Sequence, residues 1–130
     1  MAAYKWCADA YLNAALSYLS SNATQLAVIS DLGQTAGTDI TYAMLSGHIL
    51  AYVTIDSSDF TQAAGDTSGR KVTIGAQSSI SITATGTAVM VVLTNGSNAV
   101  YYCTTCSSQS LESGGTVTVP AWDIELRDPA

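Results

Sequence analysis

The chain has 130 residues, of which 48% are hydrophobic and only 11% are charged, and its formal net charge is -6. Its four basic residues are scattered along the sequence, so they cannot form the basic stripe that binding to nucleic-acid phosphates or to an anionic membrane requires. We therefore expect neither nucleic acid nor membrane as a partner. The weakly charged surface that this composition implies suits a protein that packs against neighbours, and it suits an ordinary β domain equally well.

The N-terminal sequence lacks the uninterrupted apolar region of a signal peptide, and no run of about 18 apolar residues predicts a membrane-spanning helix. We therefore expect synthesis and folding in a cytoplasm. Three cysteines, an odd number, argue against a disulfide scaffold there. Residues 1–130 are predicted to form one domain, with an arm and a helix over residues 1–24 and a β domain over residues 25–130.

Residues 9–19 carry the only convincing helical pattern of the chain. Its apolar stripe, at spacings of three and four, consists of Leu12, Ala15, Leu16 and Leu19. Tyr11 and Tyr18 are expected on the flank of the stripe. This helix could cover the open end of a barrel or reach a partner protein, and the first is the commoner use of such a stripe.

Short strands separated by turn signals are predicted for the rest of the chain. The predicted strands cover residues 25–30, 48–55, 70–74, 79–83, 87–94, 116–119 and 121–126, and Pro120 marks an edge or a bulge. Loops are predicted over residues 31–39, 56–69 (with Phe60 anchored in the core) and 107–115, and residues 40–45 fit either one helical turn or a strand. These elements predict a mainly β fold: an antiparallel β-sandwich or small β-barrel of about seven short strands with one N-terminal α-helix.

The strongest local signal is a hairpin over residues 87–106, in which two β-prone runs flank Asn95 and Gly96. Asn and Gly tolerate the positive φ that tight hairpin turns require. The first run, residues 88–93, is apolar throughout, which predicts a strand covered on both faces in the middle of the core.

Cys103 and Cys106 form a CxxC pattern, but residues three apart on a strand point to opposite faces. Only Cys7 and His48 could complete a zinc site, and a redox CxxC normally begins a helix. We therefore interpret these cysteines as buried structural residues. A nucleophile and base formed by Cys7 and His48 lacks any local signature.

The segment from Gly65 to Lys71 superficially resembles a phosphate-binding loop, but Val72 follows the lysine and a strand follows the segment. A tight loop with an ion pair from Asp66 to Arg70 or Lys71 explains it better.

Asp56 and Asp59 could contribute to a weak calcium site, but their spacing matches no complete calcium loop. No pair among the ten acidic residues stands out for glycoside cleavage. We therefore predict no catalytic residues, no cofactor and no metal site, and expect that the protein is not an enzyme.

A set of short segments spread over nearly the whole chain is distinctive when taken together. These segments are Y-L-N-A-A-L (11–16), S-N-A-T-Q (21–25), D-F-T (59–61), G-D-T-S-G-R-K-V-T (65–73), T-T-C (104–106), G-G-T-V (114–117), V-P-A-W (119–122) and D-P (128–129). In this set the chain resembles a family of small, uncharacterised structural proteins encoded by tailed bacteriophages and prophages.

The resemblance implies a virion component: a head decoration (cement) protein that is made in the host bacterial cytoplasm and binds the capsid exterior. Its expected partners are the major capsid protein and further copies of itself. Many weakly binding copies would together stabilise the capsid lattice across capsomer boundaries. A second reading is a tail, head-fibre or adsorption protein that binds a host glycan. A third is a small hydrolase, in which His48, Cys7 or an Asp pair would converge in a pocket.

Aromatic side chains are the expected contacts with a partner, because they dominate interface energetics. The candidates are Tyr4, Trp6, Tyr11 and Tyr18 in the N-terminal segment and Trp122 in the C-terminal strand. The strand of Trp122 could be an exposed edge that adds to a neighbour's sheet.

Overall fold

The computed structural model describes residues 3, 5–35 and 39–129, so Tyr4 lies outside the described residues. The fold is mainly β with one N-terminal α-helix, as predicted from the sequence, and it is a sandwich, not a closed barrel. Its elements are α1 (Asp9–Asn22), β1 (Gln25–Ile29), η1 (Tyr42–Leu45), β2 (Ile49–Thr54), η2 (Ser57–Asp59), β3 (Phe60–Ala64), β4 (Arg70–Ile74), β5 (Gln77–Ser81), β6 (Gly86–Thr94), β7 (Val100–Leu111), β8 (Thr116–Val119) and β9 (Trp122–Leu126).

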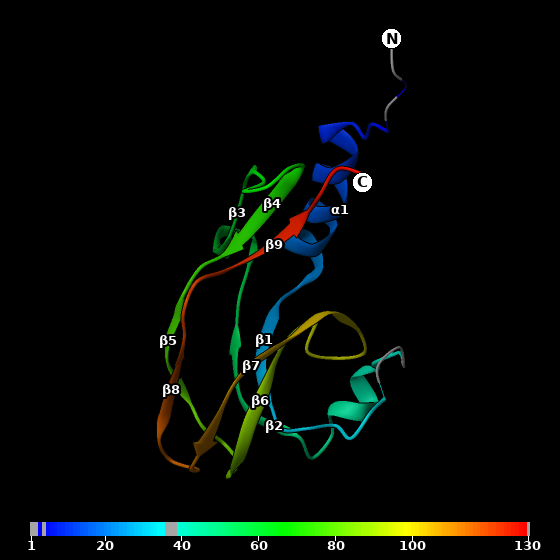
Figure 1. Cartoon of the computed structure of the whole chain (residues 1–130). Coiled ribbons are helices and arrows are strands. Elements are labelled where there is room, and N and C mark those ends of the chain that lie inside the picture. Colours follow the sequence, from blue (N-terminus) through cyan, green and yellow to red (C-terminus); the bar gives the residue numbers. More distant parts are fainter. Residues whose placement is uncertain (1–2, 4, 36–38, 130) are drawn as a thin grey trace.

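Two layers of antiparallel strands make up the sandwich (Figure 1). The first layer is one sheet in the order β2-β1-β6-β7. The second layer consists of the sheet β3-β4-β9 and the pair β5-β8. Figure 1 shows that β5 continues the path of β4 and that β9 continues the path of β8. Pro120 lies in the break between β8 and β9, both edge strands, which agrees with its predicted place at an edge.

The main core lies between the two layers and is closed at one end by α1. Buried aliphatic side chains from both layers and from the helix form it, among them Leu16, Leu26, Val28, Val72, Ile74, Leu93 and Ile124. Leu12, Leu16 and Leu19 are the buried face of α1, whereas Ala15, which the helical pattern places on the same stripe, is exposed. Among the described residues, no helix combines the length and the hydropathy that a membrane span needs.

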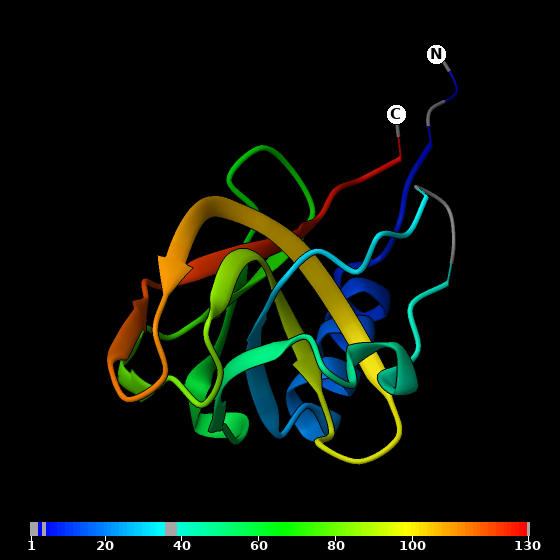
Figure 2. The ribbon, with the colours of Figure 1, turned by 90° about the horizontal axis from the view of Figure 1, so that it is seen from below.

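A second, smaller core covers the outer face of the first layer. Ala27, Ile29 and Val92 are buried there against Leu45 of η1, and Figures 1 and 2 show η1 on the opposite side of this layer from β5 and β8. Residues 91–93 of β6 are therefore buried on both faces, as predicted, while Val89 and Met90 are half-buried.

The β6–β7 hairpin is confirmed, with register pairs from Gly86–Leu111 to Thr94–Val100. Gly96 has the positive φ of 71° that the turn requires. Asn95 plays a different part: its Oδ1 accepts bonds from the backbone N–H groups of Ser97, Asn98 and Ala99 at 2.9–3.0 Å. The side chain thus satisfies donors that the turn leaves without a backbone partner.

Two predicted loops are wrong. The segment 56–69 contains η2 and β3, and the segment 107–115 contains the last residues of β7. Both have weak intrinsic β-propensity, but β3 pairs along its whole length with β4, and the end of β7 pairs with the beginning of β6. Ladder hydrogen bonds to a neighbour override local propensity here. For residues 40–45 the helical alternative is right, since η1 is a single turn, and Phe60 packs against the main core as predicted.

Candidate functional site

The outward face of α1 is apolar and carries no charge. Tyr11, Ala14, Ala15 and Tyr18 are all exposed, and their spacing of three and four residues places them on one face of the helix. Asp9 is the only charged residue of α1. An uncharged apolar face that is exposed to water, beside the face that the helix buries in its own core, is suited to contact another protein.

An apolar cleft of about 210 Å³, here called the tyrosine cleft, adjoins this face of the helix. It is lined by Ala15, Leu16, Tyr18, Leu19, Tyr101, Tyr102, Ile124 and Leu126. The rings of Tyr18 and Tyr101 meet edge to face, with centroids 6.0 Å apart. This geometry is a favourable one for aromatic pairs, so the contact joins α1 to the beginning of β7.

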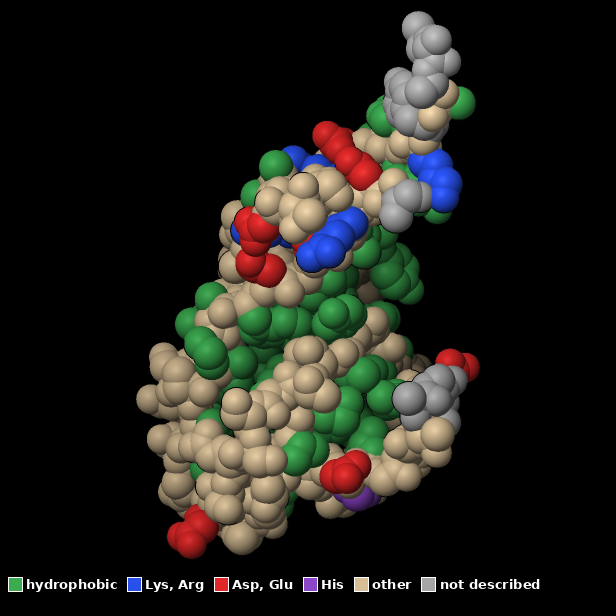
Figure 3. All heavy atoms as spheres, viewed as in Figure 1, with side chains coloured by type: hydrophobic (Ala, Val, Ile, Leu, Met, Phe, Trp, Pro, Cys, Tyr) green, Lys and Arg blue, Asp and Glu red, His purple; other side chains and the backbone are tan. Residues whose placement is uncertain are grey.

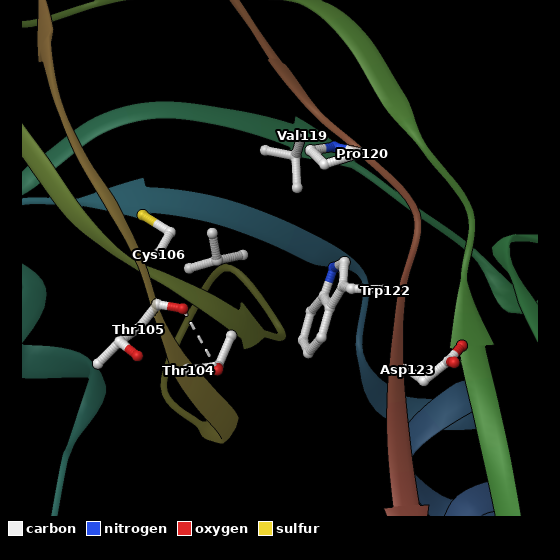
Figure 4. Close-up of a pocket in the computed structure, with 8 residues that line it drawn as sticks. Thr104, Thr105, Cys106, Val119, Pro120, Trp122 and Asp123 are labelled. Carbon is white, nitrogen blue, oxygen red and sulfur yellow. Dashed lines mark hydrogen bonds between the residues drawn. The ribbon is translucent and has the colours of Figure 1, made fainter. Parts of the chain in front are cut away.

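A second hollow, here called the edge groove, runs between β7 and the β8–β9 segment. Its first part has a volume of about 270 Å³ and is lined by Val91, Thr104, Thr105, Cys106, Val119, Pro120, Trp122 and Asp123. Figure 4 shows these side chains on facing elements. An adjoining cavity of about 240 Å³ shares Val91, Cys106, Val119 and Pro120 with it. Figure 3 shows hydrophobic side chains gathered over this part of the surface.

Tyr102 and Trp122 lie between the tyrosine cleft and the edge groove, with ring centroids 5.9 Å apart. Tyr102 lines the cleft and Trp122 lines the groove, so the two hollows form one surface. The indole Nε1 of Trp122 is buried and has no hydrogen-bond partner among the described residues. Such an unpaired donor is costly, and its presence distinguishes this place from an ordinary core position.

The two sides of the edge groove are unpaired strand edges. β7 ends the first layer, and β8 and β9 each end their sheet. From Thr105 to Ser110, β7 is exposed throughout. An edge strand presents backbone N–H and C=O groups that can bind an added strand. The groove therefore combines apolar walls with free backbone groups, which is the chemistry that an extended polypeptide needs.

A small acidic cluster surrounds Asp123, which lines the edge groove but turns its carboxylate away from Trp122 (Figure 4). The Nζ of Lys71 lies 2.8 Å from Oδ1 of Asp66 and 3.4 Å from Oδ2 of Asp123, so two carboxylates share one ammonium group. The hydroxyl of Thr73 donates to Asp123 at 2.6 Å, and this bond, with Lys71 in second place, holds the pKa of the Asp123 carboxyl below its ordinary value. The predicted ion pair of Asp66 is thus made with Lys71.

The structure brings together only part of the predicted contact set. Tyr18 and half-buried Trp122 belong to the continuous surface just described, and exposed Tyr11 adjoins it on α1. Trp6 is exposed and lines none of the described hollows, and Tyr4 lies outside the described residues.

Tyr101 and Tyr102 are contact candidates that the sequence-based reasoning missed. Their signal is present in the sequence as an aromatic pair directly after the hairpin turn. What could not be read there is which strand edge would stay open beside them.

The histidine and the cysteines considered for catalysis, zinc binding or redox activity have other surroundings in the structure. Oγ of Ser30 lies 3.0 Å from Nδ1 of His48, and His48 is not joined to Cys7. Cys103 is half-buried against the smaller core, but Cys106 is exposed on the open edge, so the prediction that both are buried is wrong for Cys106. Partial desolvation raises the pKa of the Cys106 thiol.

The aspartates considered for a calcium site form a capping box instead. The Asp56 carboxylate accepts from Ser58 N, and Asp59 Oδ2 accepts from Asp56 N, each at 2.9 Å, so both side chains cap η2. Within the described part of the chain, no three His, Cys, Asp or Glu side chains gather as metal ligands.

Comparison with known proteins gave no match: no family model fits the chain, and neither a curated protein nor a solved structure is significantly similar to it.

Proposed function

We propose that this protein is a structural component of a phage virion: a decoration protein that binds the major capsid protein on the outside of the head, across capsomer boundaries. It acts by binding and carries out no reaction. The proposal rests on the resemblance of short segments of this sequence to a family of structural proteins from tailed bacteriophages and prophages. The observation that supports it in the structure is the uncharged apolar surface of α1 and the tyrosine cleft.

The surface formed by α1 and the tyrosine cleft has the size expected for one of many weak contacts in a repeated lattice. A buried aromatic side chain contributes about 1.5–3 kcal/mol, and Tyr11, Tyr18 and Tyr102 are each at least 38% exposed. A stable interface needs about 800 Å² from each partner, which is more than these three rings supply. Single copies should therefore bind weakly, and the lattice gains stability because many copies bind to it at once.

The direct test is binding of the purified protein to expanded, protein-free capsids. The expected stoichiometry is near one copy per capsid subunit, with greater resistance of decorated heads to heat. The double variant Tyr11→Ser/Tyr18→Ser should bind at least about tenfold more weakly. Its matched control is Tyr52→Ser, which removes an exposed tyrosine from β2, the strand at the other end of the first layer. Absence of binding to heads, or equal loss of binding in both variants, would refute the proposal.

One observation favours a second candidate, an adsorption protein that binds a host glycan. Tyr18, Tyr101, Tyr102 and Trp122 line a concave surface, and sugar rings stack on such aromatic faces. Sugar hydroxyls also need polar side chains at the site. The tyrosine cleft offers only tyrosine hydroxyls, and the edge groove offers Thr104, Thr105 and Asp123. We therefore rank a protein ligand first, and binding to host cells in place of heads would reverse this order.

A further inference from the structure

The N-terminal arm is a second unpartnered feature, separate from the capsid-facing surface proposed above. Residues 5–8 have no helical or strand structure, and Trp6 is 74% exposed, the highest value among the large hydrophobic side chains that the structure describes. In Figure 1 the arm leaves the body of the protein at the end of α1 that is farther from β8. A tryptophan side chain that is so exposed to water is suited to insert into a groove of another molecule.

The charge of the arm is also unpartnered. The described residues form three ion pairs, made by Lys71 and Arg127, and Lys5 takes part in none of them. Arg70 binds Oδ1 of Asn13. Lys5 is thus a cation on an exposed arm of a protein whose net charge is -6.

The edge groove has the complementary properties. Val119, Pro120 and Trp122 provide an apolar wall, and β7 provides free backbone groups along the opposite side. Asp123, which lines the groove, shares the one ammonium of Lys71 with Asp66, and these three groups together leave one negative charge uncompensated. An occupant with one positive charge and one large aromatic side chain would satisfy both features.

We propose that the edge groove binds the N-terminal arm of a second copy of this chain. In this arrangement residues 5–8 of one copy lie as an added strand along β7 of the next. Trp6 enters the groove beside Trp122, and Lys5 lies near Asp123. The contact joins different surfaces of two identical chains, so repetition produces a closed ring or a head-to-tail series, not a two-fold dimer.

Sedimentation velocity of the isolated protein, from about 1 µM to about 1 mM, tests the proposal without capsids. The wild-type chain should self-associate, and Trp6→Ala should raise the dissociation constant at least about tenfold. Tyr52→Ala is the matched control, because Tyr52 is 50% exposed but lies on β2, at the other end of the first layer from β7. Its self-association should equal that of the wild type. A monomeric wild type, or equal effects of the two variants, would overturn the proposal.

Mixing two defective variants gives a sharper result. Cys106→Lys places a long cationic side chain in the groove and leaves the arm intact, while Trp6→Ala leaves the groove intact. At a concentration at which the wild type just associates, each variant alone should be monomeric, and the mixture should form one-to-one heterodimers that grow no further. Both substitutions are at surface residues, and unchanged thermal unfolding shows that each variant is folded. Absence of heterodimers in the mixture would contradict a contact between arm and groove, whatever the outcome of the capsid experiment.

Discussion

The Nε of Arg70 on β4 donates a hydrogen bond to the side-chain oxygen Oδ1 of Asn13 on α1, at 2.9 Å. This bond is partly buried, and it holds the helix against the second layer beside the packing of Leu12, Leu16 and Leu19. The outward face of α1 can serve as a binding surface only while the helix keeps this position.

Asn13→Ala should destabilise the protein by about 1–3 kcal/mol, because it leaves a donor of the Arg70 guanidinium without its partner in a partly buried place. The measurement is urea unfolding followed by circular dichroism. Ser17→Ala is the control, since it removes an exposed bond of 2.9 Å from Gln62 to the same helix. It should cost less than Asn13→Ala, and equal costs would mean that Arg70 is solvated by water.

Leu16→Ala should cost about 2–5 kcal/mol, because Leu16 is only 2% exposed and its removal leaves a cavity between α1 and the sandwich. Ala14→Ser on the exposed face of the same helix should change the unfolding free energy by less than about 0.5 kcal/mol. Unfolding curves in urea compare the two variants. A small cost for Leu16→Ala would show that α1 detaches without disturbing the core.

Gly96→Ala and Gly69→Ala form a matched pair, because both glycines have a positive φ near 70°. At Gly96 an added Cβ meets only Gln25 side-chain atoms, at 3.6 Å or more, so the expected cost is the backbone strain of about 1–2 kcal/mol. At Gly69 the Cβ would overlap the carbonyl oxygen of Leu126. The melting temperature of Gly69→Ala should therefore be well below that of Gly96→Ala. Equal melting temperatures would contradict the close approach of the Leu126 carbonyl oxygen to Gly69.

Acid should weaken the fold through Asp123 and Glu125. The Thr73 hydroxyl lowers the pKa of Asp123, and the Thr67 backbone N–H, followed by Arg127, lowers that of Glu125. A carboxyl whose pKa is lower in the folded state stabilises the protein above its ordinary pKa of about 4. This contribution is lost as the pH falls through the lowered value.

Asp123→Asn should therefore flatten the acid side of the curve of unfolding free energy against pH. Glu112→Gln is the control, because Glu112 forms no ion pair among the described residues. Urea midpoints measured between about pH 3 and pH 6 provide the comparison. If the unfolding free energy falls equally steeply with decreasing pH in Asp123→Asn and in the wild type, the Asp123 carboxyl does not contribute to the loss of stability in acid.

The sequence predicts the elements whose signal is local. The leucine stripe of α1 and the turn around Gly96 both follow from short-range periodicity and backbone preference. β3 and the end of β7 were missed because they owe their strand structure to pairing with β4 and β6. The composition of Phe60–Ala64 alone does not indicate a strand.

The candidate site depends even more on distant parts of the chain. Trp122 and Tyr11 were expected as contact residues, but the edge groove exists because β7 and the β8–β9 segment approach each other and remain unpaired. No local sequence pattern indicates that two strand edges remain unpaired. Tyr101 and Tyr102 were missed for the same reason, since both line a cleft that α1, β7 and β9 form together.

The pairing of β4 with β9 also bears on how the chain folds during synthesis. Val72 pairs with Ile124, so this sheet acquires its last strand only after the residues between them and β9 itself have left the ribosome. Contacts between segments so far apart in sequence place the protein among the slower two-state folders, on the scale of about milliseconds to seconds. Until β9 pairs with β4, Val72 and Ile74 lack one neighbouring strand. The nascent protein then exposes an unpaired apolar strand edge that chaperones would bind.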